Sequence, residues 1–136
     1  MRLETRHRLV EYGVLAVLVA AALAGPAWWR NREAARLGEE LTRLARPGDI
    51  EMVSSVTCIY CERARDWLTA HGAPFSECYI EKDRACMARY EQLGAAGTPT
   101  FLIKGRLLRG YSAPAIVEAL RRPAATPPPP PPAAGG

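Results

Sequence analysis

Two cysteines, Cys58 and Cys61, stand three positions apart in the segment TCIYC. A thiolate is the attacking species in thiol–disulfide exchange, and the start of a helix stabilises it through free backbone N–H groups and the helix dipole. A second cysteine one turn further along the helix can resolve the mixed disulfide that the first one forms. The spacing therefore predicts redox chemistry, with Cys58 as nucleophile and Cys61 as resolving cysteine. Zinc sites use the same spacing, so the elements around the pair have to decide between the two chemistries.

The segments around the pair alternate between strand and helix patterns. A loosely alternating segment at 50–54, bounded by turn residues, predicts a strand before Cys58, and helical spacing of apolar residues predicts a helix over 62–71. Further along we expect a strand at 75–80, a helix over 83–93, strands at 100–103 and 107–109, and a last helix over 113–121. The order β-α-β-α-β-β-α predicts an α/β fold with one mixed four-stranded sheet flanked by helices.

Gly97-Thr98-Pro99 stands just before the predicted strand at 100–103. A cis proline there can hold an extended backbone open for a substrate peptide. Tyr60, between the two cysteines, is interpreted as part of the surface that the substrate meets. This context favours the redox interpretation of the pair over a zinc site.

With these residues in view, residues 50–120 resemble the glutaredoxin branch of the thioredoxin superfamily. The matching features occur in family order: TCIYC after a strand, HGAPF at the end of a helix, IEKD after the second strand, then GTPTFLIKG and GYSAP. The resemblance implies a thioredoxin-like fold, with Cys58 as nucleophile, Cys61 as resolving cysteine and Pro99 as the cis proline. It also implies that Thr98 offers backbone hydrogen bonds to the substrate and that Gly110 belongs to the substrate-binding surface.

Departures from the glutaredoxin pattern bear on the partner. Ile59 stands where glutaredoxins usually have proline, and Ser55 where they usually have lysine. The residues that help to hold glutathione in the family are reduced here to Arg109-Gly110 and Ala113. Protein dithiols and disulfides are therefore the partners expected, with glutathione as a further candidate, and no cofactor or metal is expected.

The other two cysteines need a separate explanation. Cys78 falls in the predicted second strand and Cys86 near the start of the second helix. That helix should pack beside the strand, so the two side chains can meet in a structural disulfide. Two buried free thiols, or a redox or metal-binding role, are the alternatives. A zinc site built from all four cysteines is disfavoured, because the second pair is too widely spaced.

Residues 12–29 read YGVLAVLVAAALAGPAWW, an uncharged run long enough to cross a bilayer. The Trp28-Trp29 pair followed by arginine matches an aromatic belt with a cationic anchor. We therefore predict a transmembrane signal anchor within 1–29. A cleaved signal peptide is the alternative, because Ala22-Leu23-Ala24 is an A-x-A cleavage pattern.

The rest of the chain divides into three parts. Residues 30–47 are interpreted as an amphipathic connector helix, 48–122 as the glutaredoxin-like domain, and 123–136 as a proline-rich disordered tail. Either interpretation of the N-terminus implies export, and an even cysteine count suits an oxidising compartment. We expect a single-pass protein of the bacterial inner membrane with its C-terminal domain in the periplasm, or a cleaved exported form.

The net charge of +4 does not indicate a nucleic-acid partner, because the basic residues are spread along the chain and do not cluster with aromatic residues. The leading hypothesis is a membrane-anchored thiol–disulfide oxidoreductase. The alternatives are a non-catalytic accessory or assembly subunit of a membrane complex, and a metal or iron–sulfur carrier with the same fold. The intact cysteine pair argues against the first alternative, and the presence of Cys61 weakens the second.

Overall fold

The computed structural model describes residues 2–126, which fall into two compact units divided after Arg36. The first unit is the larger part of helix α1 (Arg2–Leu44), which contains Pro26. Its large apolar side chains between Val10 and Trp29 are exposed, and Trp29 is 68% exposed. From Val10 onward α1 is long and apolar enough to cross a membrane, a property that an N-terminal signal sequence shares.

The end of the apolar run carries an aromatic and cationic cluster. The indole rings of Trp28 and Trp29 meet edge to face with centroids 5.4 Å apart. The Arg32 guanidinium lies 4.0 Å from the centroid of the Trp28 ring, within the range of a cation–π contact. Amphipathic rings beside a cation suit the boundary between hydrocarbon and water.

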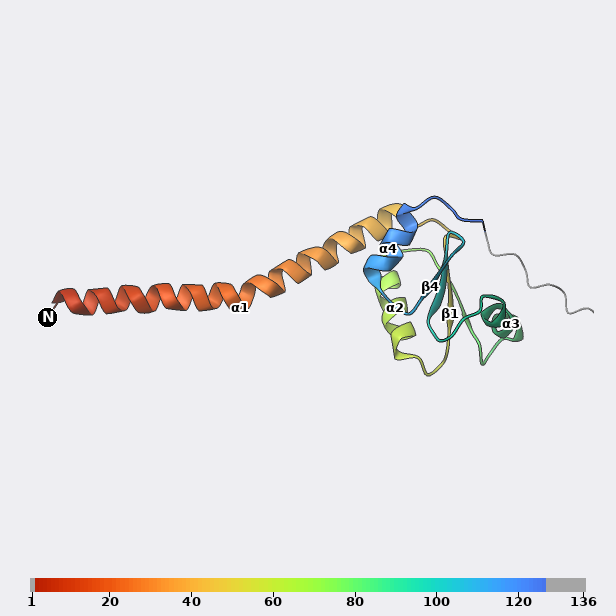
Figure 1. Ribbon diagram of the computed structural model, residues 1–136, viewed down its shortest axis with the longest axis horizontal. Helices are drawn as coiled ribbons and strands as arrows, with labels where there is room; N and C mark the ends of the chain where they lie inside the picture. The colour runs from red at the N-terminus through yellow and green to blue at the C-terminus, as the bar shows by residue number, and fades with distance from the viewer. Residues whose placement is uncertain (1, 127–136) are drawn as a thin grey trace, which may run out of the picture. The chain divides into compact units, whose positions relative to one another are not determined.

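The second unit is built on a mixed β-sheet (Figure 1). Its four strands lie in the order β2-β1-β3-β4. The strands are β1 (Ile50–Ser54), β2 (Ser76–Tyr79), β3 (Thr100–Ile103) and β4 (Arg106–Arg109). β1 runs parallel to β2 and antiparallel to β3, and β3 pairs antiparallel with β4. The mixed four-stranded sheet predicted from the sequence is confirmed.

A two-residue turn joins β3 to β4. Lys104 and Gly105 both have positive φ, at 47° and 79°. This combination gives the type of turn whose twist matches that of the flanking strands. It sets the register that pairs Ile103 with Arg106.

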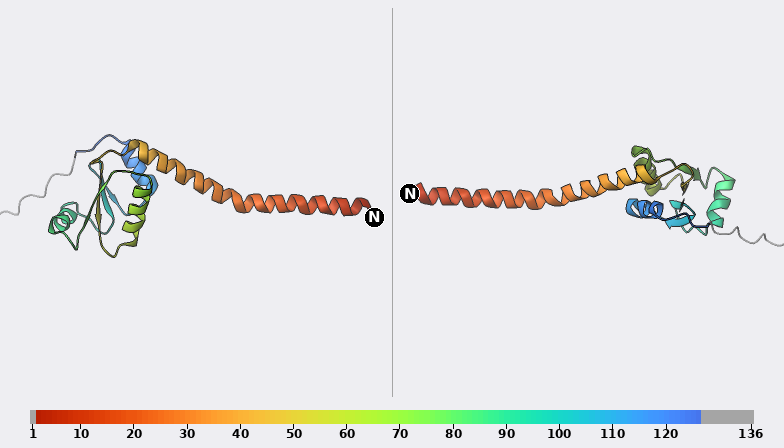
Figure 2. Two further views of the ribbon diagram at one scale, coloured as in Figure 1. Left: turned by 180° about the vertical axis from the view of Figure 1, so that it is seen from behind. Right: turned by 90° about the horizontal axis from the view of Figure 1, so that it is seen from above.

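Helices cover both faces of the sheet (Figures 1 and 2). They are α2 (Ile59–Ala70), α3 (Arg84–Gln92) and α4 (Ala113–Arg121). Successive strand residues point to opposite faces, so Met52 belongs to the core cluster under α2 and α4, and Val53 to the cluster under α3. An ion pair from Arg89 Nε to Glu51 Oε1, 2.8 Å long, also joins α3 to β1.

The last two turns of α1 belong to the core of the second unit. Leu41 is fully buried and Ala45, just beyond the helix, is 4% exposed. Thr42 Oγ1 donates a 2.9 Å hydrogen bond to the carbonyl of His71, at the end of α2. Gly38 lies against the His71 imidazole, and any added Cβ would overlap that ring. This part of α1 is therefore packed like a core helix.

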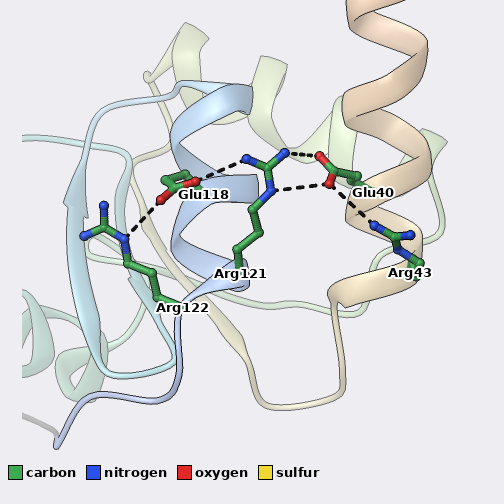
Figure 3. Close-up of polar contacts among 5 residues, drawn as sticks. All are labelled: Glu40, Arg43, Glu118, Arg121 and Arg122. Atoms are coloured by element: carbon green, nitrogen blue, oxygen red, sulfur yellow. Dashed lines mark hydrogen bonds and ion pairs between the residues drawn. The ribbon is translucent and has the colours of Figure 1, made fainter.

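Exposed ion pairs add a polar link between α1 and α4 (Figure 3). Arg121 binds Glu40 of α1 and, 3.2 Å away, Glu118 on its own helix. Arg43 and Arg122 extend the network, each pairing with one of these carboxylates. The hydrogen bonds that Arg121 donates to Glu40 and Glu118 raise the pKa of Arg121 above its ordinary value. Because these side chains are at least partly exposed to solvent, their ion pairs contribute little to stability.

The structure describes the boundary at 29/30 and the first residues of the tail in the four-part division of the chain. Helix α1 continues through the boundary between 29 and 30, and the four-part division stays a prediction. In the tail, the Ala125 N–H donates to the Lys104 carbonyl at 2.8 Å, and Arg106 Nη2 donates to the Pro123 carbonyl at 3.3 Å. The proline run at 127–132 lies outside the described residues.

Candidate functional site

Cys58 and Cys61 lie at the N-terminus of α2 and form a disulfide, with Cα atoms 5.3 Å apart. Cys58 is the N-cap residue, and its Sγ accepts a 3.1 Å hydrogen bond from the Cys61 N–H. Cys58 is partly buried, whereas Cys61 is fully buried. A partner can therefore reach the Cys58 sulfur, whereas the Cys61 sulfur lies behind it.

Helix α2 begins at Ile59, three residues earlier than the sequence predicts. Sequence rules look for Ser, Thr, Asp or Asn at the N-cap, and here a cysteine sulfur takes that role. The same N–H that caps the helix can stabilise a thiolate on Cys58 after reduction, together with the positive end of the helix dipole. The arrangement can therefore perform thiol–disulfide exchange.

A carboxylate that the sequence analysis assigned no role fixes the loop before Cys58. Glu81, just after β2, accepts hydrogen bonds from the Ser55 hydroxyl and from the Val56 N–H, the latter at 3.2 Å. The bond from Ser55 is the main reason why the pKa of Glu81 lies below its ordinary value. The Ser55 carbonyl in turn accepts the N–H of Cys58 at 3.3 Å. By holding this loop, Glu81 also helps to fix the position of Cys58.

A second carboxylate from β2 fixes α2 itself. Glu77 accepts two hydrogen bonds from Arg65 on α2, at 2.7 and 2.8 Å, and one from the buried Ser54 hydroxyl at 2.6 Å. Burial raises the pKa of Glu77, but the bonds from Arg65 and Ser54 outweigh it, so the pKa lies below its ordinary value. The ion pair ties the helix that carries both cysteines to the neighbouring strands.

The residues predicted to contact substrate lie in two places. The Thr98–Pro99 peptide bond is cis, Pro99 is buried, and its carbonyl accepts the Gly110 N–H at 2.8 Å. Tyr60 is 54% exposed, and the Arg63 guanidinium lies 5.5 Å from its ring centroid. Within residues 2–126, no side-chain hydrogen bond joins Tyr60, Thr98 or Pro99 to the cysteine pair. Their roles toward substrate stay predictions.

Cys78 on β2 and Cys86 on α3 form a second disulfide, with Cα atoms 5.7 Å apart. It lies in the core cluster beneath α3, away from α2, and Cys86 is 2% exposed. Cys86 is also the buried residue of this nine-residue helix. Across the residues that the structure describes, no group of three or more His, Cys, Asp or Glu side chains is arranged to hold a metal ion.

Replacing Cys78 and Cys86 together with alanine should lower the free energy of unfolding by about 2–3 kcal/mol, because the disulfide restricts a short loop in the unfolded chain. Urea unfolding of the oxidised full chain in detergent measures the loss. As the control, wild type and variant should have nearly equal stability when both are measured under reducing conditions, where neither chain holds a disulfide. Mass mapping that finds both thiols free in oxidised wild type would contradict the pairing.

Comparisons with known proteins give a consistent picture of the second unit. Residues 50–108 match the family model described as Glutaredoxin. A mutant of the thioredoxin-like protein BC3987 has a TM-score of 0.51 at 23% identity, and the match covers 54% of this chain and 96% of that one. This similarity establishes a thioredoxin-like fold.

Two further solved structures are similar at lower TM-scores. The glutaredoxin from Methanosarcina mazei Go1 is 22% identical, with a TM-score of 0.48 and coverage of 54% of this chain and 78% of that one. Methanosarcina acetivorans methanoredoxin is 21% identical, with a TM-score of 0.49 and coverage of 58% and 90%. No curated protein sequence matches the chain.

Proposed function

We propose that the protein is a membrane-anchored thiol–disulfide oxidoreductase acting through Cys58 and Cys61. The match of residues 50–108 to the Glutaredoxin family model supports this proposal. One observation carries the proposal: the Cys58 sulfur caps α2, accepts the Cys61 N–H and is bonded to the Cys61 sulfur. A nucleophile, the group that stabilises its anion and the resolving thiol are all present at one helix terminus.

The reaction proceeds in two exchange steps when the pair is reduced. The Cys58 thiolate attacks one sulfur of a substrate disulfide, a Cys58–substrate S–S bond forms, and the leaving substrate thiolate takes up a proton. The Cys61 thiol then loses its proton and attacks the Cys58 sulfur, which releases the second substrate thiol. The substrate gains two electrons and two protons, and the pair ends as a disulfide. From the oxidised form, the same steps run in reverse and oxidise a substrate dithiol.

Protein dithiols and disulfides are the proposed substrates, with glutathione as a further candidate. The Ser55 hydroxyl, which stands where glutaredoxins usually have a lysine, is bound to the Glu81 carboxylate. This position therefore supplies no cation that could pair with a carboxylate of glutathione.

We also propose that α1 is a single-pass anchor in the bacterial inner membrane and that the domain lies in the periplasm. The exposed apolar run and the contact of Arg32 with Trp28 support the anchor. The Cys78–Cys86 disulfide supports an oxidising compartment. Cleavage before Gly25 would give an exported form with the same domain.

After reduction, the Cys58 thiol should titrate below the value of about 8.5 that is typical of a free cysteine. Alkylation rates measured against pH, with each cysteine identified by mass spectrometry, give the pKa of each thiol. Cys61 is the internal control, because it is fully buried and should react slowly at every pH. A Cys61 that reacts faster than Cys58 would reverse the assignment of roles.

A further inference from the structure

The second unit exposes few large apolar side chains. Among residues 37–126, four are exposed by more than a third: Val56 at 46%, Ile59 at 55%, Tyr60 at 54% and Met87 at 39%. The first three all lie within two positions of Cys58 in the sequence. The exposed apolar surface of this unit is thus concentrated at the nucleophile.

Folding has left these side chains in water although burying one of them would contribute about 1.5–3 kcal/mol. Their backbone is nevertheless fixed. The Val56 N–H is bound to Glu81, and Ile59 and Tyr60 occupy the first turn of α2 behind the capping sulfur. Exposed large apolar side chains on a fixed backbone beside a reactive group are typical of an interaction site.

The chemistry of Cys58 specifies what covers the patch. A partner that reacts there must bring its own sulfur to about 2 Å from the Cys58 sulfur. The residues next to the partner's cysteine are then carried over Val56, Ile59 and Tyr60. The charged neighbours are of both signs, with Glu62 and Glu81 against Arg63 and Lys82, so they do not select for a charged partner.

We infer that Val56, Ile59 and Tyr60 form a recognition surface for an extended protein segment with apolar side chains beside its reacting cysteine. The inference rests on the proposed function and names the substrate class of the same site. Small hydrophilic disulfides reach Cys58 but carry nothing that covers the three side chains. Selectivity therefore lies in the sequence around the partner's cysteine.

The test compares two peptides, each with one cysteine that is capped as a mixed disulfide with 2-mercaptoethanol. Leucine and valine flank the cysteine in the apolar peptide, and serine and glycine flank it in the polar peptide. The reduced full chain in detergent should react about 10-fold or more faster with the apolar peptide. In the double variant Val56→Ser/Ile59→Ser, the ratio of the two rates should fall close to one. The matched control is Met87→Ser, which removes the exposed apolar side chain outside the patch and should keep the wild-type ratio.

The possible failures can be told apart with bis(2-hydroxyethyl) disulfide as a third substrate. If wild type does not exchange with it, the proposed function fails. If wild type exchanges with it but reacts equally with both peptides, only the recognition surface is overturned. An equal fall in the ratio for Met87→Ser would also overturn it, as would self-association that the double variant abolishes, since a second copy would then be the occupant.

Discussion

Replacing Cys58 with serine is expected to lower the rate of thiol–disulfide exchange on the order of 10³-fold or more, to the level of the uncatalysed reaction. A serine hydroxyl is not ionised near neutral pH and cannot form the S–S bond of the mixed disulfide. The remaining thiol of the pair is fully buried behind the helix cap, so it does not substitute for the lost nucleophile. Reduction of bis(2-hydroxyethyl) disulfide and of a peptide disulfide by the full chain measures the loss.

Cys61→Ser is the matched variant, and the structure predicts a different outcome for it. The hydrogen bond that the Cys58 sulfur accepts comes from the backbone N–H of residue 61, which serine retains. Cys58 should therefore keep its lowered pKa and its first-step rate, while unresolved mixed disulfides accumulate. Non-reducing gels and mass spectrometry detect these adducts and identify the partners. Wild-type rates in both variants would show that exchange occurs elsewhere.

Much of the fold could be predicted because the signals are local. The alternating segment at 50–54 and the helical spacing of apolar residues each specify an element within a few residues, and β3 and α4 have the predicted bounds. The start of α2 differs because a cysteine acts as its cap. The chemistry of the site follows from the spacing of Cys58 and Cys61 for the same local reason.

The supports of the site could not be predicted because they join residues far apart in the sequence. Glu77 and Glu81 look like ordinary solvated charges, and only the parallel pairing of β1 with β2 brings them to Ser54 and Ser55. The partner of Cys78 stayed open for a similar reason. A strand and a helix can pack with many rotations, and only some of them place two sulfurs within bonding distance.

The packing of the predicted connector helix is a third feature that could not be predicted in full from the sequence. Apolar residues at helical spacing indicate that one side of 30–47 is buried, but not how deeply. In the structure, Leu41 is fully enclosed by the core cluster that includes Leu68 of α2 and Leu120 of α4. A segment that the sequence separates from the domain thus supplies part of the domain's core.

Leu41→Ala should therefore lower the free energy of unfolding of the second unit by about 2–5 kcal/mol, because it removes buried methyl groups and leaves a cavity. A loss of this size is a large fraction of the stability of a small domain. Pulse proteolysis of the full chain in detergent over a range of urea concentrations measures it, with cleavage sites mapped by mass spectrometry. The matched control is Glu39→Ala, an exposed position in the same helix, which should change the stability by less than about 0.5 kcal/mol.

The outcome decides where the folding unit of the domain begins. If Leu41→Ala destabilises the chain and Glu39→Ala does not, the unit includes the end of α1, and a fragment starting at Gly48 should be less stable by a similar amount or more. If Leu41→Ala has no effect, the end of α1 is dispensable and the division at 47/48 proposed from the sequence holds. Because Cys58 lies at the opposite end of α2 from His71, where α1 packs, the Cys58 pKa should be the same in Leu41→Ala as in wild type.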